Sequence, residues 1–335
     1  MKYFYCHSYQ MFNLALYYKN NLNEDIIVIT EETNIVKACE YLNISYLKHK
    51  KFVFSDWEFI KKNRSVKREL SRVIKEVGES ELHFSHTQSA VFCMLLIHKS
   101  KGNLFFHDFE LVYPRYNFPV LKLKPVIKYA QRYLNILMIS LLYKNVPLVL
   151  KKVNISGAMV GISLNYIHKK SKIKHYEEGN YYKTTLKLFK SYKLDYPKIK
   201  NLFIAQNYYV DYKSKPRNYN EILEKVFKML VKYNFRLKKH PKFTEPSQIS
   251  NLEKLPDFLP VELFFNCVEN SIVSFHSASL ITAGHFNKVK SISLINLINN
   301  ADNELILNWR LKMSSWSTNL LFPGNIDDFE SIIKN

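Results

Sequence analysis

The sequence contains few cysteines, and none of them lies close to another. The four are spread over 335 residues without a Cys-x-x-Cys pair, at Cys6, Cys39, Cys93 and Cys267. Disulfide-rich domains and structural zinc sites need closely spaced cysteines, so this spacing argues against both. We therefore expect no bound metal and a reducing compartment, the cytoplasm.

Long apolar segments are also missing. The N-terminus has no uncharged apolar stretch that ends in small residues, so we expect no secretory signal. No run reaches the roughly 18 consecutive apolar residues that a membrane-spanning helix needs. The nearest is YLNILMISLLY at 133–143, inside a segment at 121–152 that interleaves apolar residues with cations. That segment fits an interfacial membrane helix and an ordinary core helix equally well.

The local signatures of several enzyme classes are absent. There is no Gly-x-Gly-x-x-Gly, no Gly-x-x-x-x-Gly-Lys-Ser/Thr, no Gly-x-Ser-x-Gly and no His-Glu-x-x-His. Dinucleotide enzymes, P-loop proteins, serine hydrolases and zinc proteases therefore lack sequence support. An Asp-x-Asp pair, which would hold a divalent ion on a nucleotide diphosphate, is missing as well. A bound phosphate is then expected to be held by histidine, lysine and backbone N–H groups.

Positive charge is present in excess. The chain has 49 Lys and Arg residues against 29 Asp and Glu residues, a formal charge of +20. Such a field attracts nucleic acid, nucleotide phosphates or an anionic membrane, although a lysine-rich surface alone also accounts for it. Zinc-finger spacing, an RNA-binding signature and a basic low-complexity tail are all missing, so we do not expect nucleic acid as a partner.

Segments of strand and helix character alternate along the chain. Strands are predicted at 25–30, 103–106, 201–206, 235–240, 271–276 and 289–295. Helices are predicted at 34–42, 218–235, 260–267 and 277–284, and the second of these carries one apolar face, made of Ile222, Val226, Leu230 and Tyr233. Strands joined by helix-length connections form parallel sheets, which predicts an α/β protein. Its length predicts two domains, with a boundary in the tyrosine-rich stretch at 185–199.

Polar side chains follow two of the predicted strands in the second half. His240 ends the strand at 235–240, and Ser277 follows the strand at 271–276. In open α/β sheets, ligands bind outside the carboxyl ends of the strands. A serine that opens a helix can hold a phosphate together with backbone N–H groups. By position alone, a simple helix cap at Ser277 and a surface histidine at His240 explain the pattern as well.

Four segments together resemble the bacterial sialyltransferases of the lipooligosaccharide and polysialic-acid type. The opening FYCHSYQMFNLAL resembles the strand-turn-helix start of the lipooligosaccharide enzymes. After NLFIAQ, the chain carries KKHP at 238–241, LPVELFF at 259–265 and SFHSASL at 274–280. The family has a His-Pro motif, a Pro-x-Glu segment and a serine motif in this order. The similar segments lie near the two ends of the range from residue 3 to about residue 296. The resemblance is specific because the segments occur in the same order as in the family.

The resemblance implies a GT-B-like fold, in which two Rossmann-like domains with parallel sheets face each other across a cleft. Residues 1–195 would bind the acceptor and residues 196–335 the CMP-sugar, with the last helix able to pack back on the first domain. The implied enzyme is inverting, needs neither a metal nor a cofactor, and moves sialic acid from CMP-sialic acid to a hydroxyl of a glycan in lipopolysaccharide, lipooligosaccharide or capsule. A basic surface would also draw it to lipid-linked acceptors at the anionic inner membrane.

The resemblance also assigns roles to residues of the second domain. His240 would donate a hydrogen bond or a proton to the departing phosphate. Ser277 would hold the same phosphate, and Ser279 is a weaker candidate for that contact. Glu262 would accept hydrogen bonds from the ribose hydroxyls of CMP, and Lys239 would add positive charge beside the nucleotide.

In the family, the base that activates the acceptor hydroxyl lies in an acidic pair followed by glycine. This chain departs from that pattern. The chain spells that motif once, at 177–179. By order and spacing, however, the family motif ends a strand of the first domain, which places Asp108 in the second acidic position and His107 in the first. We prefer Asp108, because a strand-end carboxylate can face the cleft. Glu178, with the acidic residue before it, is the alternative base.

Two other classes of function stay open at this point. A GT-B transferase with another activated sugar would share the fold and the cationic site but bind a UDP- or GDP-linked donor. A non-catalytic protein that binds polyanions would explain the charge of +20. It would leave the ordered His-Pro, Glu and Ser positions without a role.

Overall fold

The computed structural model describes most of the chain, in segments separated by gaps. They are residues 1–50, 63–85, 91–107, 173–176, 178–206, 219–239, 246–277, 279–286, 288–298, 310–311, 314–315, 317 and 319–334. The chain divides into two compact units, 1–184 and 185–335, and each is described here by itself. The roles assigned to 1–195 and 196–335 stay predictions.

The first unit is built around a parallel sheet whose described strands follow the Rossmann order. The sheet order is β3-β2-β1-β4-β5-β6, and neighbouring strands pair in parallel. The strands are β1 (Lys2–Tyr5), β2 (Ile26–Thr30), β3 (Tyr46–Lys48), β4 (Glu81–Phe84), β5 (Leu104–His107) and β6 (Ile173–Tyr176). From β1 the chain adds β2 and β3 on one side, and it then returns to add β4, β5 and β6 on the other side. The strand order therefore reverses between β1 and β4, and α/β sheets bind ligands at such switch points.

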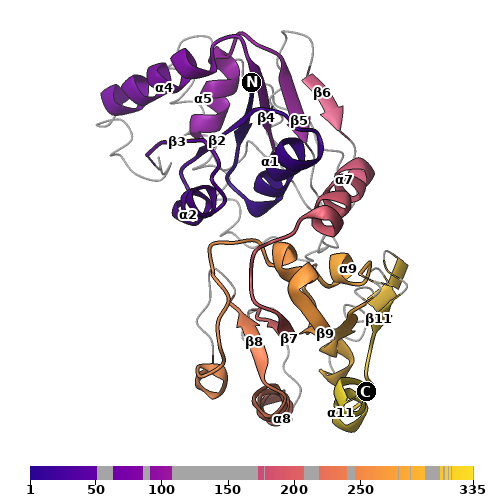
Figure 1. The fold of residues 1–335 in the computed structure, drawn as a ribbon. Coiled ribbons are helices and arrows are strands. Elements are labelled where there is room, and N and C mark those ends of the chain that lie inside the picture. The colour runs from indigo at the N-terminus through magenta and orange to yellow at the C-terminus, as the bar shows by residue number, and fades with distance from the viewer. Residues whose placement is uncertain are drawn as a thin grey trace, which may run out of the picture. The chain divides into compact units, whose positions relative to one another are not determined.

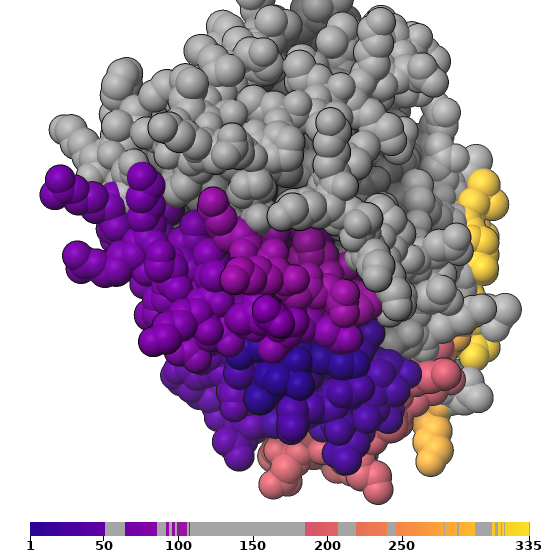
Figure 2. All heavy atoms as spheres, turned by 90° about the horizontal axis from the view of Figure 1, so that it is seen from above, coloured from indigo at the N-terminus to yellow at the C-terminus, as the bar shows by residue number. Residues whose placement is uncertain are grey.

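Helices cover both faces of this sheet (Figure 1). They are α1 (Tyr9–Asn21), α2 (Thr33–Tyr41), α4 (Asn63–Val77) and α5 (Val91–Lys99). Helix α7 (Glu178–Ser191) follows β6 and includes the boundary between the two units. Alternation along β1 decides which helix meets which side chain. Tyr3 and Tyr5 join the core formed with α4 and α5, whereas Phe4 packs on Tyr18 of α1, with 5.1 Å between ring centroids. Both faces of β1 are therefore buried, which explains its nearly continuous apolar sequence. In the space-filling view of Figure 2, the described residues of this unit, indigo to purple, form a continuous surface.

The second unit repeats the same topology. Its sheet order is β11-β10-β9-β7-β8, again parallel throughout. The strands are β7 (Ile199–Ile204), β8 (Phe235–Lys238), β9 (Val268–Ser274), β10 (Lys290–Ser293) and β11 (Leu320–Leu321). A single parallel bridge between Leu237 and Lys254 adds the start of a further strand outside β8. With that bridge counted, the order from this edge reads 3-2-1-4-5-6, the Rossmann order once more.

Helices α8 (Tyr219–Lys232) and α11 (Ile326–Lys334) share the main core of the second unit. Val226 and Leu230 are fully buried there, and Ile222 and Tyr233 pack against the same cluster, so the predicted apolar face of α8 is confirmed. Phe329 of α11 belongs to this core as well. The shorter helical elements are η1 (Ser247–Ile249), η2 (Val261–Cys267), α9 (Ser279–Ala283) and η3 (Leu294–Leu297).

The predicted fold class is confirmed, because one chain contains two Rossmann-like α/β units, the architecture of the GT-B class. Each predicted strand overlaps an observed one. The segment at 260–267 is helical as expected but forms a 3₁₀ helix. No helix in the described residues has the length and hydropathy to cross a membrane. The segment at 121–152 lies outside the described residues.

Asn201 connects several segments of the second unit. Its side chain is buried on β7, and its Nδ2 donates a hydrogen bond of 3.0 Å to the carbonyl oxygen of Tyr233, just after α8. Its Oδ1 accepts hydrogen bonds from Ser271 Oγ at 2.8 Å and from Asn270 Nδ2 at 3.0 Å. One amide therefore holds β7 to β9 and to the turn that leads into β8.

Replacement of Asn201 by alanine should destabilise the chain. We expect the free energy of unfolding to fall by about 2–4 kcal/mol, because each lost hydrogen bond contributes roughly 0.5–1.5 kcal/mol and buried partners are left unpaired. Urea denaturation of the full chain measures the change. Asn220→Ala, at an exposed position of α8, is the control and should change stability by less than about 0.5 kcal/mol. Equal losses in the two variants would contradict this account.

Candidate functional site

The switch point of the second sheet lies between β7 and β9, and a hydrogen bond joins the two strand ends there. The backbone N–H of His276, after β9, donates to Oε1 of Gln206, after β7, at 3.0 Å. Gln206 is only 6% exposed, and its Nε2 has no hydrogen-bond partner within the part of the chain that the structure describes. A buried N–H group without an acceptor is unfavourable, so this amide is a ready donor for a ligand oxygen. Sequence reasoning missed Gln206, although its position at the end of NLFIAQ was a signal.

Three of the residues singled out from the sequence form one connected group at the same edge. Ser279 Oγ donates a hydrogen bond of 2.7 Å to Oε1 of Glu262. The N–H of Ser279 in turn donates to Ser277 Oγ at 3.3 Å. The Pro-x-Glu segment on η2 is thereby tied to the serine motif before and at the start of α9. Helix α9 has five residues, so the hydroxyl groups contribute more to this site than an aligned helix dipole.

The Glu262 carboxyl group lies in an environment that disfavours its charge. Burial raises the pKa of Glu262, while the hydrogen bond from Ser279, its own backbone N–H and the nearby Lys238 act in the opposite direction. Ser279 and Lys238 favour the ionised form, in which both carboxylate oxygens accept hydrogen bonds from hydroxyl groups. Glu262 is therefore suited to accept hydrogen bonds from a polyhydroxylated ligand.

A buried lysine, not singled out from the sequence, supports this group. Lys238 is the last residue of β8 and is 5% exposed, and its Nζ donates to the carbonyl oxygen of Pro256 at 2.5 Å. Burial lowers the pKa of Lys238 to about 8, with Asp257 and Glu262 opposing that shift. Lys239, the predicted cation, directly follows β8 and is partly buried. Lys238 therefore fixes the loop that leads into η2.

The remaining predicted residues are placed as follows. His240, Asp108 and the acidic residue before Glu178 lie outside the described residues. Glu178 is the first residue of α7. His107, which takes the first position of the preferred base motif, is the last residue of β5. Asp108 therefore follows a strand end directly in the sequence, as the preferred assignment requires.

Imidazole groups gather at the carboxyl edge of the first sheet. His107 ends β5 and His49 follows β3, and both are 2% exposed. His7 follows β1 after one residue and is partly buried. Among the described residues, no group of three His, Cys, Asp or Glu side chains could hold a metal ion. The described imidazole groups at this edge can form hydrogen bonds and exchange protons.

No family model matches the chain, and no curated protein matches its sequence. Solved structures of similar fold include UDP-GlcNAc 2-epimerase of Methanocaldococcus jannaschii in complex with UDP-GlcNAc and UDP, a glycosyltransferase of Rickettsia africae and MurG of Acinetobacter baumannii. Their identities are 13%, 14% and 10%, and their TM-scores are 0.43, 0.37 and 0.34. The alignments cover 96%, 97% and 100% of this chain and 88%, 93% and 99% of the other chains. At these values the similarity assigns no function, which must come from the residues of this chain.

His49 gives the first unit a defined response to acid. Its ring stacks on Phe92, with 4.0 Å between centroids, and its Nδ1 lies 2.9 Å from the carbonyl oxygen of Lys50, to which a protonated Nδ1 donates. Burial lowers the pKa of His49 from 6.5 to about 4. The folded state therefore binds this proton less readily than the unfolded chain does.

Acidification should remove the stability that His49 contributes. Its contribution is complete above pH 6.5 and falls as the pH drops from about 6.5 to about 4, by roughly 3 kcal/mol in total. Phenylalanine cannot take up a proton, so His49→Phe should lose less stability than the wild type over this range. Denaturant unfolding of both full chains at a series of pH values between 7 and 4 measures the difference. Two parallel pH profiles would contradict the prediction.

Proposed function

We propose that this protein is a GT-B glycosyltransferase that transfers sialic acid from CMP-sialic acid to a hydroxyl of a cell-surface glycan, without a metal ion. The observation that carries the proposal is the 2.7 Å hydrogen bond between Ser279 and Glu262. It joins the two motifs that resemble the nucleotide-binding part of sialyltransferases, at the carboxyl edge where α/β sheets bind ligands. The surrounding groups are donors and acceptors suited to a ribose and a phosphate.

The nucleotide would be held by groups of the second unit. Glu262 accepts hydrogen bonds from the vicinal ribose hydroxyls, with one of its oxygens oriented by Ser279. The hydroxyl of Ser277 and Nε2 of Gln206, which has no acceptor among the described residues, donate to phosphate oxygens. Lys239 adds positive charge beside them, which favours an anionic donor.

The transfer itself would need an acid and a base, at positions that the sequence assigns. As the bond between the anomeric carbon and the CMP oxygen breaks, negative charge grows on the phosphate, and His240 donates a hydrogen bond or a proton to it. The acceptor oxygen attacks the anomeric carbon from the opposite side and gives its proton to Asp108, or to Glu178 in the alternative assignment. Alignment of hydroxyl, anomeric carbon and phosphate would supply much of the rate.

The acceptor would be a glycan of lipopolysaccharide, lipooligosaccharide or capsule, free or lipid-linked. The formal charge of +20 supports peripheral contact with an anionic inner membrane from the cytoplasmic side. Equal partition of the protein between anionic and neutral vesicles would remove that part of the proposal. The binding test below distinguishes CMP-sialic acid from a different nucleotide-sugar donor and from a protein that binds no donor.

CMP should stabilise the protein through Glu262. We expect Glu262→Gln to weaken CMP binding by at least roughly tenfold, because a charged acceptor for two hydroxyls is lost, and Ser279→Ala by about two- to tenfold, because one orienting hydrogen bond is lost. The shift of the thermal midpoint with CMP concentration measures both. Glu253→Gln, which removes an exposed carboxylate paired with Arg236 in the same unit, is the matched control and should bind CMP as the wild type does.

The same assay separates the competing functions. Stabilisation by CMP and not by UDP or GDP supports the proposed donor. A preference for UDP or GDP would replace it by another nucleotide sugar. Stabilisation by a short oligonucleotide alone would favour a non-catalytic protein that binds polyanions.

Turnover should depend on His240 and on one of the two candidate bases. His240→Ala is expected to lower the rate of CMP release from CMP-sialic acid by roughly 10²–10⁴-fold, the usual contribution of a positioned acid or base. Asp108→Ala should have an effect of the same order, and Glu178→Ala little effect. The reverse ranking of the last two variants would transfer the base to Glu178. Full turnover of His240→Ala would reject the mechanism.

A further inference from the structure

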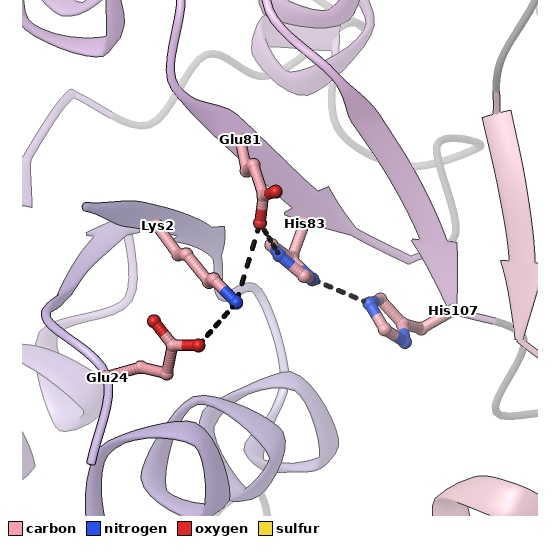
Figure 3. A network of polar contacts seen from close by, with 5 residues as sticks. All are labelled: Lys2, Glu24, Glu81, His83 and His107. Atoms are coloured by element: carbon pink, nitrogen blue, oxygen red, sulfur yellow. Dashed lines mark hydrogen bonds and ion pairs between the residues drawn. The ribbon is translucent and has the colours of Figure 1, made fainter. Parts of the chain in front are cut away.

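A chain of polar contacts crosses the first sheet from its amino edge to its carboxyl edge (Figure 3). At the amino edge, Lys2 Nζ lies 2.8 Å from Glu24 Oε1 and 3.6 Å from Glu81 Oε2. The same Glu81 oxygen lies 3.7 Å from Nε2 of His83. At the other end, Nδ1 of His83 is 3.0 Å from Nε2 of His107, the last residue of β5. A partly exposed carboxylate is thus connected to an imidazole beside the position proposed for the base.

The parallel register puts the members of this chain on one face of the sheet. Lys2 of β1 pairs with Glu81 of β4, and His83 of β4 pairs with Phe105 of β5. Because side chains alternate along a strand, Glu81 and His83 share a face, and so do Phe105 and His107. The arrangement follows from the strand sequences: ELHF places Glu81 and His83 two positions apart, and LFFH places His107 two positions after Phe105.

Aromatic rings fix the orientation of His83. Its ring stacks between Phe4 and Phe105, with centroid separations of 4.4 and 4.6 Å, and Tyr18 of α1 approaches at 5.1 Å with its ring plane steeply inclined. With both faces covered, only the edge of the imidazole is available for polar contacts. Nδ1 faces His107 within hydrogen-bond distance. Nε2 is buried, has no hydrogen-bond partner among the described residues, and has the Glu81 carboxylate 3.7 Å away.

Both imidazoles are neutral near pH 7. Burial, together with the neighbouring His107 and Lys2, lowers the pKa of His83 to about 2, and burial lowers the pKa of His107 to about 4. A neutral imidazole carries one N–H, so the contact between the two rings contains one shared proton. Only two arrangements of protons are then possible for this pair.

Electrostatics distinguishes the two arrangements. If His83 carried its proton on Nδ1, the bare lone pair of Nε2 would face the carboxylate of Glu81, which is repulsive. If His83 carries it on Nε2, the N–H dipole points at the carboxylate, and Nδ1 accepts a hydrogen bond from Nε2–H of His107. The carboxylate therefore favours the second arrangement, in the way that the aspartate of a catalytic triad selects the tautomer of its histidine. In that arrangement Nδ1 of His107 carries no proton.

We propose that Glu81, acting through His83, fixes the tautomer of His107, so that Nδ1 of His107 is a hydrogen-bond acceptor at the carboxyl end of β5. His107 is thereby a positioning residue for the base position that follows β5, a role that rests on the proposed function. A surface carboxylate at one edge of the sheet sets the hydrogen-bonding character of a buried group at the other edge.

Nitrogen chemical shifts of the imidazoles test the tautomer directly. In full-length protein with ¹⁵N-labelled histidine, long-range proton–nitrogen spectra at pH 7 should show His83 and His107 with protonated Nε2 and bare Nδ1. Single His→Asn variants at the two positions assign the signals. Glu81→Leu removes the carboxylate without offering a new donor or acceptor, and it should raise the population of the Nδ1–H form in both rings. Glu81→Gln also removes the negative charge but keeps the shape of the side chain. It therefore separates the effect of the charge from an effect of altered packing in Glu81→Leu.

Glu24→Gln is the matched control, because it removes a carboxylate from the same network but not the one that faces His83. We expect its imidazole spectra to match those of the wild type. Protonated Nδ1 on His83 in the wild type would overturn the proposal. So would unchanged spectra in Glu81→Leu, or equal changes in Glu24→Gln and Glu81→Leu.

Kinetics test the positioning role separately. Glu81→Leu should lower kcat for CMP release from CMP-sialic acid by about tenfold, less than the roughly 10²–10⁴-fold that loss of a base causes, while KM for the donor stays unchanged. A wild-type kcat in a variant with altered tautomers would overturn the role of His107. If the wild type has the expected tautomers but no transferase activity with any nucleotide sugar, the proposed function fails and the tautomer assignment stands.

Discussion

Within each unit, every strand pair that the structure describes is parallel, and this constraint organises the rest of the molecule. All segments that follow strands must then lie along one edge of the sheet, while the strands themselves are buried between helices and are mostly apolar. Polar groups are consequently concentrated where strands end. In the second unit these groups are Gln206, Lys238 and His276. In the first unit they include His49 and His107.

Much of the fold could be read from the sequence because it depends on local patterns. The apolar face of α8 repeats every three or four residues, and strands such as DIIVIT are uninterrupted apolar runs. The link between Ser279 and Glu262 could not be read in this way, since the residues are 17 positions apart and lie in short helical elements. Gln206 was missed for another reason, because its importance comes from burial of an amide, and burial depends on how the whole unit packs. His83 is a lone histidine in the strand ELHF, where nothing local indicates that two aromatic rings enclose it.

Burial controls the charge of the candidate site in a coupled way. Burial lowers the pKa of Lys238 and raises that of Glu262, so each group on its own tends toward its neutral form. Each also favours the charged form of the other, since opposite charges attract more strongly in a poorly hydrated environment. A ligand with hydroxyl groups meets a carboxyl group that is already partly desolvated, so less desolvation is needed when it binds. The same low hydration lowers the pKa values of His49, His83 and His107 in the first unit, so these imidazoles act there as neutral hydrogen-bonding groups.

The residues assigned to chemistry share a relation to buried neighbours in the sequence. His240 follows Lys238 after one residue, and Lys238 is fixed by its hydrogen bond to Pro256. Asp108 comes directly after His107, which is fixed by its hydrogen bond to His83. In each unit a strand thus ends in a buried polar residue with a described hydrogen-bond partner, and the reactive residue assigned from the sequence follows one or two positions later. A group held within about one residue of a rigid strand end has few backbone dihedrals left to order, so less conformational entropy is lost when substrate binds.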